Sequence, residues 1–244
     1  MPSRFDTVQL MRRFYQEAGV RPVEGGFAVA LDGRTPKSPG GVALVLPTEA
    51  LAGLVAAEWA AQEEHIQFAA MPATRLAFTA LEKVADARDA VADEVARYAG
   101  SDVLCYFAEH PADLNGRQTA GWGPVLDWAE ETLGVRLERA AGIVHRPQPA
   151  EALERVRSLA AEGDDFTLAG LAHATALLGS AILALAVQRG RLTGEGAFEL
   201  SRLDEAFQEE QWGVDEEAAQ RTGALRAEAA LMERWFRALD AGAA

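Results

Sequence analysis

The stretch GGFAVALDGRTPKSPGGVALVLP, residues Gly25–Pro47, decides the fold. On both sides of a segment rich in glycine and proline, large apolar side chains alternate with smaller ones, which is typical of two strands joined by a turn. The sequence therefore predicts an antiparallel sheet near the N-terminus. The alternating residues are Phe27, Val29 and Leu31 in the first run, and Val42, Leu44 and Leu46 in the second.

Outward from this stretch, the apolar spacing is helical. A short amphipathic helix is expected over residues 6–18, and Thr48 is a good N-cap for a helix over residues 49–64. A long helix should follow from Arg75 to Tyr98, ended by Gly100. Further helices are expected near residues 117–133, 150–161, 167–189, 194–211 and 218–239, with an extended connection over residues 135–149.

The fold class that follows is α+β. We expect a small mixed α/β N-terminal domain with antiparallel strands over residues 1–78, followed by a larger all-α helical bundle over residues 79–244. The boundary is placed where the strand pattern ends and the acidic, helical part begins. A chain of 244 residues is long enough for this arrangement.

One uncharged stretch, Leu168–Val187, has about the length of a membrane-spanning helix. Its many alanine and glycine residues give little insertion energy, so we expect the buried central helix of a soluble bundle and no membrane insertion. Its small residues recur every four positions, which predicts a strip that a second helix can approach closely. The strip consists of Ala172, Ala176, Ser180 and Ala184.

The formal net charge of -14 is unevenly distributed. Residues 1–80 hold 8 acidic and 7 basic side chains, which leaves 29 acidic and 16 basic side chains for residues 81–244. Nucleic-acid binders need a basic stripe, and the sequence has none, so a nucleic-acid partner is not expected. An acidic surface suits a basic protein partner, although it can also serve solubility alone.

No residue pattern indicates a catalytic or metal site, so we expect no enzyme, no cofactor and no metal. The single cysteine, Cys105, lies among apolar residues and is expected to be buried. Because one cysteine cannot form an internal disulfide and the sequence shows no secretory signal, we expect a bacterial cytoplasmic location. Motifs such as HExxH and GxSxG are absent. The histidines, which lie far apart in the sequence, are His65, His110, His145 and His173.

The loop Asp32–Gly41 superficially resembles a phosphate-binding loop but lacks the GxxxxGK[ST] pattern. Its prolines remove backbone donors that a phosphate would need. A rigid connection between strands is the simpler interpretation. The alternative is a loop that contacts a partner protein through its two cations, Arg34 and Lys37.

The segment LSRLDEAFQEEQWG, Leu200–Gly213, reads as one amphipathic helix. Leu200, Leu203 and Phe207 cluster on one side as a core stripe, with the acidic and tryptophan-bearing face opposite. Exposed tryptophan is common where proteins bind each other. Either this face binds a partner, or a neighbouring helix covers it. The residues of that face are Glu205, Gln208, Glu209 and Trp212, with Asp204 beside Glu205.

Several segments occur together in an order that resembles a known family. They include FAVALDGRTPKSP, LPTEALAGLVAAEWAAQEEHI, MPATRLAFTA, YAGSDVLCYFAEHP and LDEAFQEEQWGVDEEA. Together they are similar to the assembly chaperones of the F-type ATP synthase that bind the alpha subunit of the catalytic head. The resemblance runs from about Arg12 to about Leu239.

The resemblance implies a non-enzymatic chaperone that shields the unassembled alpha subunit until the beta subunit pairs with it, and we expect it to act as a monomer. It also implies a mitochondrial matrix location for eukaryotic relatives, and it ties function to the acidic position before Phe207, which is Glu205 here, with Asp204 beside it. Two alternatives stay open: a small hydrolase or transferase with a site between the two domains, and an acidic adaptor for another basic protein.

Overall fold

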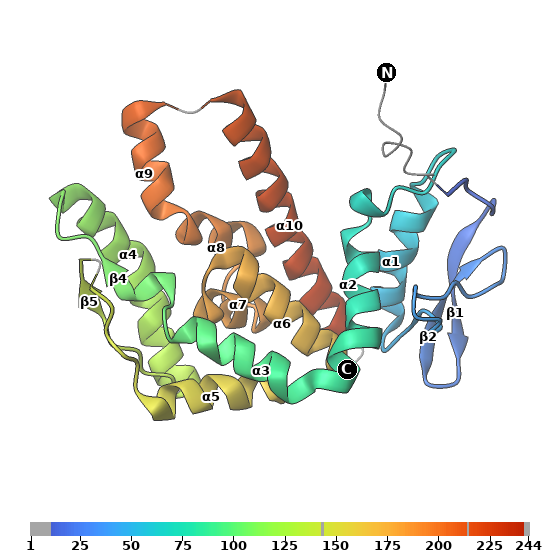
Figure 1. The fold of residues 1–244 in the computed structure, drawn as a ribbon, viewed down its shortest axis with the longest axis horizontal. Coiled ribbons are helices and arrows are strands. Elements are labelled where there is room, and N and C mark those ends of the chain that lie inside the picture. Colours follow the sequence, from blue (N-terminus) through green and yellow to red (C-terminus); the bar gives the residue numbers. More distant parts are fainter. Residues whose placement is uncertain (1–10, 143, 214, 242–244) are drawn as a thin grey trace, which may run out of the picture. The chain divides into compact units, whose positions relative to one another are not determined.

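A computed structural model describes residues 11–142, 144–213 and 215–241. The chain divides into two compact units: unit 1 comprises residues 1–82 and 238–244, and unit 2 comprises residues 83–237. Unit 1 contains the three-stranded sheet, whereas unit 2 is mostly helical, which confirms the α+β class (Figure 1). The division into separate folding domains at residues 1–78 and 79–244 stays a prediction.

The sheet of unit 1 is antiparallel, in the order β1-β2-β3. Strand β1 (Ala18–Val23) pairs with β2 (Gly26–Leu31), and β2 pairs with the short β3 (Val45–Leu46). Val29, Leu31, Leu44 and Leu46 are buried, as their alternation predicts, while Phe27 is half-buried and Val42 exposed. After β2, Asp32 adopts a left-handed conformation with φ 48°, and its carboxylate accepts hydrogen bonds from the backbone of Gln16 and Glu17.

The helix predicted over residues 6–18 is wrong for residues 11–18, and residues 6–10 lie outside the described part of the chain. Residues 11–17 are not helical, and Ala18 begins β1. The backbone of this segment bonds to a distant one: Arg13 N donates to Glu64 O at 2.9 Å, and Ile66 N donates to Met11 O at 2.8 Å. These pairings satisfy the backbone without a helix, and the local periodicity does not reveal them.

Helix α1 (Glu49–Ala60) begins where predicted and ends four residues earlier. The Thr48 hydroxyl accepts a hydrogen bond from Leu51 N at 3.1 Å, as an N-cap should. It also donates to the carbonyl of Ala238, another residue of unit 1, at 2.7 Å. In the middle of the unit 1 core, Trp59 of α1 packs edge-on against Tyr15 and Phe68.

A carboxylate from α1 caps the next helix. Helix α2 (Pro72–Thr79) has Met71 at its N-cap position, which offers no side-chain hydrogen bond. Glu58 supplies it, since its carboxylate accepts from the backbone of Ala73 and Thr74 at 2.8 and 2.7 Å and from the Thr74 hydroxyl at 2.8 Å. Burial raises the pKa of Glu58 despite these bonds.

The long helix predicted from Arg75 to Tyr98 is interrupted. Helix α2 passes into a π-helical turn over Ala80–Val84, and α3 (Ala85–Ala99) follows, with a non-helical residue, Ala87, at φ -138° in its first turn. The short 3-10 turns of the chain lie at Phe68–Ala70 and Val103–Cys105.

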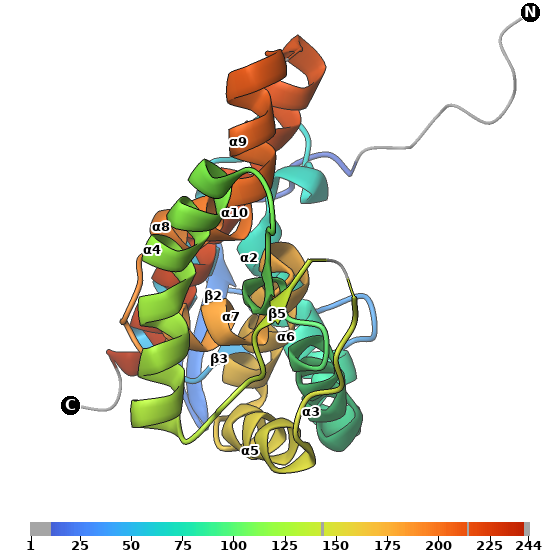
Figure 2. The ribbon, with the colours of Figure 1, turned by 90° about the vertical axis from the view of Figure 1, so that its left-hand side faces the viewer.

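Unit 2 is a helical array with one small parallel strand pair, β4 (Tyr106–Phe107) with β5 (Ala140–Ala141). Strand β5 lies in the connection predicted as extended; Ile143 of that connection is outside the described residues. Figures 1 and 2 show the helices from two directions. They are α4 (Ala112–Trp128, continued by a π turn, Ala129–Leu133), α5 (Ala150–Ala161), α6 (Asp165–Leu178), α7 (Ala181–Gln188), α8 (Gly194–Ser201), α9 (Leu203–Trp212) and α10 (Glu216–Asp240).

The single helix predicted over residues 167–189 is two helices. Gly179, at φ 62°, ends α6 in a left-handed conformation, and the Ser180 hydroxyl caps α7 by accepting from Leu183 N at 2.9 Å. Seven of the eight residues of α7 are buried, as expected for a central helix. No helix in the described part of the chain is long and apolar enough to cross a membrane.

The predicted small-residue strip is wrong, because Ala176 is exposed and Ala172 only partly buried. Close helix approach occurs instead at Gly170 of α6, where a Cβ atom would lie 2.9 Å from the Trp235 ring and 2.8 Å from the Phe236 ring of α10. The Trp235 indole N–H donates to the carbonyl of Phe166 at 3.0 Å, which fixes this crossing.

Candidate functional site

The helix predicted over residues 194–211 also breaks, and the break positions the candidate site. Arg202, at φ -114° and ψ 22°, separates α8 from α9. Leu200 therefore belongs to α8, and the segment Leu200–Gly213 is not the single helix that the sequence predicted. The face that we expected to bind a partner lies on α9 alone, and it starts at a change of helix direction.

Helix α9 is anchored to α4 through its apolar side. A Cβ atom on Gly121 of α4 would lie 2.9 Å from Leu200 and 3.5 Å from Leu203, so both leucines pack closely on this glycine. The Trp122 indole N–H donates to the carbonyl of Leu200 at 2.9 Å. The predicted core stripe thus faces α4, although its members are half-buried rather than buried.

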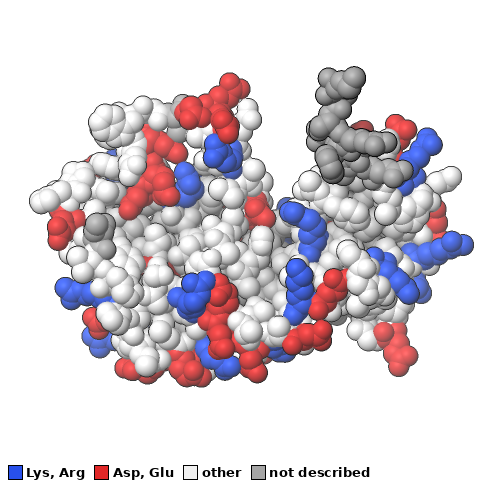
Figure 3. Space-filling view, in the orientation of Figure 1, with Lys and Arg blue, Asp and Glu red and all other residues white. Residues whose placement is uncertain are grey.

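The opposite side of α9 is exposed. Trp212 is 87% exposed, the highest exposure among the large hydrophobic residues that the structure describes, and Glu205 and Gln208 are exposed as well. None of the ten residues of α9, all of them described, is buried. In the described part of the chain, no neighbouring helix covers Trp212, contrary to that alternative. Figure 3 shows carboxylates gathered over α9 and the start of α10.

One arginine stands between two carboxylates of this face. Arg202 contacts Glu209 at 3.2 Å and lies 3.9 Å from Glu205. A single guanidinium cannot neutralise both groups, and the side chain of Glu205 is 51% exposed. Glu205 therefore keeps unused acceptor capacity for a cation outside the chain.

Asp204 points elsewhere. Its carboxylate accepts a hydrogen bond from the Gln118 amide of α4 at 2.7 Å, and Gln118 in turn accepts from Ala108 N at 2.7 Å. Gln118 is fully buried. Asp204 thus attaches α9 to α4, while Glu205, Gln208, Glu209 and Trp212 form the outer surface, which we call the α9 outer face.

Sequence reasoning missed the residues of α4 that hold this helix. Arg117 stacks over Phe207 at 5.1 Å and forms two hydrogen bonds with Glu210, at 2.9 and 2.8 Å. Gln118 could have been recognised, because it recurs with Leu114 and Trp122 at four-residue spacing on an otherwise apolar stripe. A polar residue on such a stripe indicates a buried hydrogen-bond partner.

The cations of the predicted contact loop lie in unit 1. Arg34 and Lys37 follow β2 and are exposed, and neither side chain has an ion pair within the described part of the chain. Two contacts hold the loop. The backbone of Lys37 pairs with that of Ala43, and the backbone N–H of Gly40 donates to the Glu82 carboxylate.

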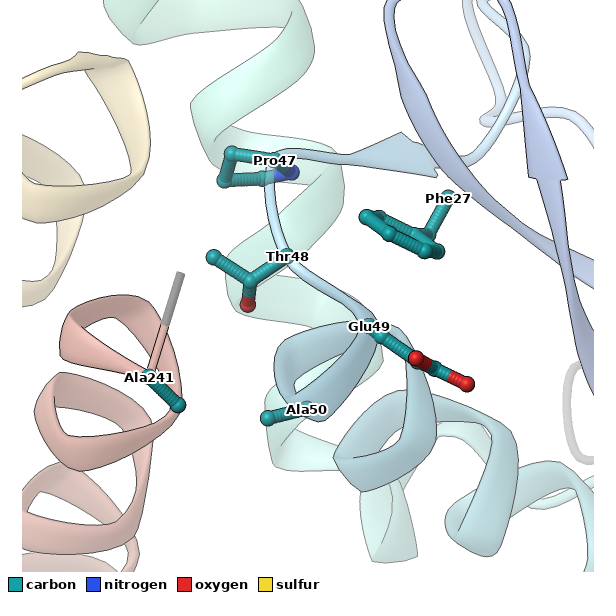
Figure 4. A pocket seen from close by; sticks show the side chains of 6 residues that line it. All are labelled: Phe27, Pro47, Thr48, Glu49, Ala50 and Ala241. Carbon is teal, nitrogen blue, oxygen red and sulfur yellow. The ribbon is translucent and has the colours of Figure 1, made fainter. Parts of the chain in front are cut away.

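Each unit has hollows on its surface. One of them, of about 540 Å³ in unit 1, is lined by one ionisable residue, Glu49, and otherwise by Phe27, Pro47, Thr48, Ala50 and Ala241 (Figure 4). Among the described residues, no group of three or more potential ligands could hold a metal ion. Cys105 is buried, as predicted, and burial raises the pKa of its thiol.

Two of the histidines have identifiable structural partners instead. His145 lies 2.9 Å from the Tyr106 hydroxyl, and His173 lies 2.9 Å from Glu228 of α10. These contacts explain the positions of both imidazole rings without a catalytic role.

Comparisons with known proteins show which proteins the chain is similar to. The sequence profile of a family described as "ATP12 chaperone protein" matches residues 12–130. Among curated proteins, the mitochondrial protein atp12 of Schizosaccharomyces pombe is 25% identical over 221 residues, which cover 85% of this chain and 75% of that protein.

Solved structures are more similar. Atp12 from Paracoccus denitrificans is 44% identical with a TM-score of 0.87, covering 93% of this chain and 97% of that one; a mutant of the same protein is 43% identical with the same TM-score and coverage. The Atu1473 protein of Agrobacterium tumefaciens, described as "a putative chaperone", is 42% identical with a TM-score of 0.87, covering 93% of this chain and 86% of that one.

The identity and coverage extend through both units, and they agree with the resemblance read from the sequence motifs. The family is one of chaperones rather than enzymes, so the prediction of a non-enzymatic protein is confirmed and the hydrolase or transferase alternative falls. The chain belongs to the ATP12 chaperone family.

Proposed function

We propose that this chaperone acts in assembly of the F-type ATP synthase by binding the unassembled alpha subunit and preventing its aggregation until the beta subunit pairs with it. We further propose that it does so as a monomer in the bacterial cytoplasm, where its client would be made. The observation that carries the proposal is the α9 outer face, in which a tryptophan exposed by 87% stands among carboxylates.

The chemistry of this face suits an orphan subunit. A subunit that awaits its partner exposes an apolar interface, and exposed apolar patches of this kind aggregate. Trp212 offers a large apolar contact, while Glu205 and Glu209 favour a client surface that carries arginine or lysine. The aromatic contact supplies affinity, and the carboxylates speed the encounter and disfavour acidic partners.

The residues divide into contact and positioning roles. We assign Glu205, Gln208, Glu209 and Trp212 to direct contact, and Asp204 to holding the helix through Gln118 at 2.7 Å. Arg34 and Lys37 are proposed as a second, weaker contact, because their exposed charges lack ion-pair partners in the described chain and would attract acidic groups of the client.

The proposal is tested by the aggregation of purified alpha subunit, followed by light scattering, with and without the chaperone. Glu205→Lys and Trp212→Ala should each reduce protection, while Trp212→Phe should retain most of it. We expect each harmful change to weaken binding by at least about tenfold, as typical for a central contact residue. A matched control is Glu131→Lys, an equal charge change at an exposed residue of unit 2 away from α9.

Two outcomes would contradict the proposal. If Glu205→Lys folds normally and protects as well as the unchanged protein, the α9 outer face is not the contact. If the chaperone, used as bait in a lysate, retains a different basic protein and no alpha subunit, the adaptor alternative replaces the proposed client.

A further inference from the structure

A second hollow, of about 360 Å³ in unit 2, combines cationic, apolar and aromatic walls. It lies where the π turn after α4, the helix α5 and the residue that ends α7 come together. Leu133 and Leu159 are buried and line it, and the half-buried ring of Trp128 forms another part of its wall. The volume is near the lower end of the range for small-molecule sites, roughly 300–1,000 Å³.

Two arginines at this hollow share one carboxylate. Arg189 contacts Glu162 at 3.0 Å, and Arg155 lies 3.6 Å from the other oxygen of the same group. The lining therefore has one more positive than negative charge, although the chain as a whole has a net charge of -14. The side chains of Arg155 and Arg189 are 43% and 39% exposed, so a ligand can reach them.

The backbone fixes where these cations lie. Arg155 donates its Nε–H to the carbonyl of Leu133 at 2.8 Å, at the end of the π turn. Arg189 is the C-cap of α7, and its backbone N–H bonds to the carbonyl of Leu185. These bonds use few of the five N–H donors that each guanidinium group carries. Donors on both arginines therefore remain for an incoming anion.

We propose that this hollow binds a small organic anion that carries one carboxylate or phosphate group on a flat apolar body. The acidic group would lie between Arg155 and Arg189, and the flat body would pack against Trp128 and the two leucines. Ion pairs at an exposed surface contribute little to stability, so stability alone gives little reason for two arginines around one carboxylate. The proposal is independent of client binding by α9.

Four simple probes test the two halves of the proposed chemistry. Phenyl phosphate and benzoate carry both the charge and the ring, inorganic phosphate carries the charge alone, and benzyl alcohol carries the ring alone. Titrations followed by NMR should shift the Trp128 indole N–H and the Nε–H signals of Arg155 and Arg189. We expect the first two probes to bind with saturation and the last two to bind at least about tenfold more weakly.

Substitutions of opposite effect separate a binding site from a structural ion pair. Arg189→Gln should weaken phenyl phosphate binding about tenfold, because a charge-assisted contact is lost. Glu162→Gln should strengthen it about threefold, because a repelling carboxylate is removed from beside the ligand. Arg191→Gln is the matched control, since Arg191 is exposed two residues further on and does not line the hollow; it should leave binding unchanged.

Several results would overturn the proposal. Absence of a saturable shift with phenyl phosphate and benzoate, or equal weakening by Arg189→Gln and Arg191→Gln, would leave only general electrostatic attraction. Equal binding of inorganic phosphate and phenyl phosphate would reject the aromatic part. If no probe binds but Arg189→Gln impairs protection of the alpha subunit, the hollow belongs to the client surface and not to a small molecule.

Discussion

At the scale of single residues, Asp102 combines complete burial with a capping role. Its carboxylate accepts from the backbone N–H groups of Leu104 and Ile182, each at 3.2 Å, and from the Ser180 hydroxyl. It therefore joins the turn before β4 to the start of α7. Burial outweighs these hydrogen bonds and raises the pKa of Asp102 to about 6.

The raised pKa predicts a pH dependence with a definite sign. The folded protein binds the Asp102 proton more tightly than the unfolded chain, whose pKa is near 3.8. This contribution to stability is complete below about pH 3.8 and disappears as the pH rises through about 6. The shift corresponds to about 3 kcal/mol, at roughly 1.4 kcal/mol per pKa unit.

The variant Asp102→Asn isolates this contribution, because the effects of the other titrating carboxylates on stability are the same in both proteins and cancel in the difference. The free energy of unfolding of the unchanged protein, relative to that of the variant, should fall by about 3 kcal/mol between pH 3 and pH 7. Urea denaturation at several pH values measures it. The neighbouring Cys105 thiol does not interfere, because its raised pKa keeps it neutral in this range. A constant difference would show that Asp102 is not buried as described.

At the scale of helices and strands, the sequence predicted where most elements lie but not where helices break. Helix α5 was predicted at its observed bounds from apolar spacing, and α1 at its observed start from the cap that Thr48 provides. The break at Gly179 has a local signal, a glycine followed by a capping serine, that the long apolar run obscured. The break at Arg202 has no such signal, because contacts with α4 determine it.

The same distinction explains the candidate site. Helical spacing alone put Glu205, Gln208, Glu209 and Trp212 on one side of a continuous helix, where Glu205, Gln208 and Trp212 are exposed and Glu209 is half-buried. It could not show that Asp204 turns toward Gln118, because that contact joins residues 86 positions apart. Long-range hydrogen bonds of this kind leave little trace in a local pattern.

Close helix packing gives a prediction at this scale. A Cβ atom on Gly194, the first residue of α8, would lie 2.0 Å from the carbonyl oxygen of Ala229 in α10, whereas Gly53 in α1 has open space around it. Gly194→Ala should therefore lower the free energy of unfolding by about 1–3 kcal/mol. Gly53→Ala, the matched control, should raise it by roughly 0.5–1 kcal/mol through helix propensity. Urea denaturation measures both changes. Equal changes in the free energy of unfolding for the two variants would contradict the packing of α8 on α10.

At the scale of the whole molecule, the negative charge is concentrated where the client is proposed to bind. Residues 203–220 contain seven carboxylates and no lysine or arginine, which is half of the net charge of -14. Residues 1–80 are close to neutral by comparison. A local concentration of this kind steers a basic partner toward α9, whereas a solubility role would need no such bias.

The most direct test of this account is amide hydrogen exchange of the chaperone, measured with and without the purified alpha subunit. Binding at the α9 outer face should slow exchange over residues 203–212 and the start of α10, while α5 in the same unit changes little. Slowed exchange in other regions with unchanged rates throughout α9 would contradict the central claim, even if the alpha subunit remains bound.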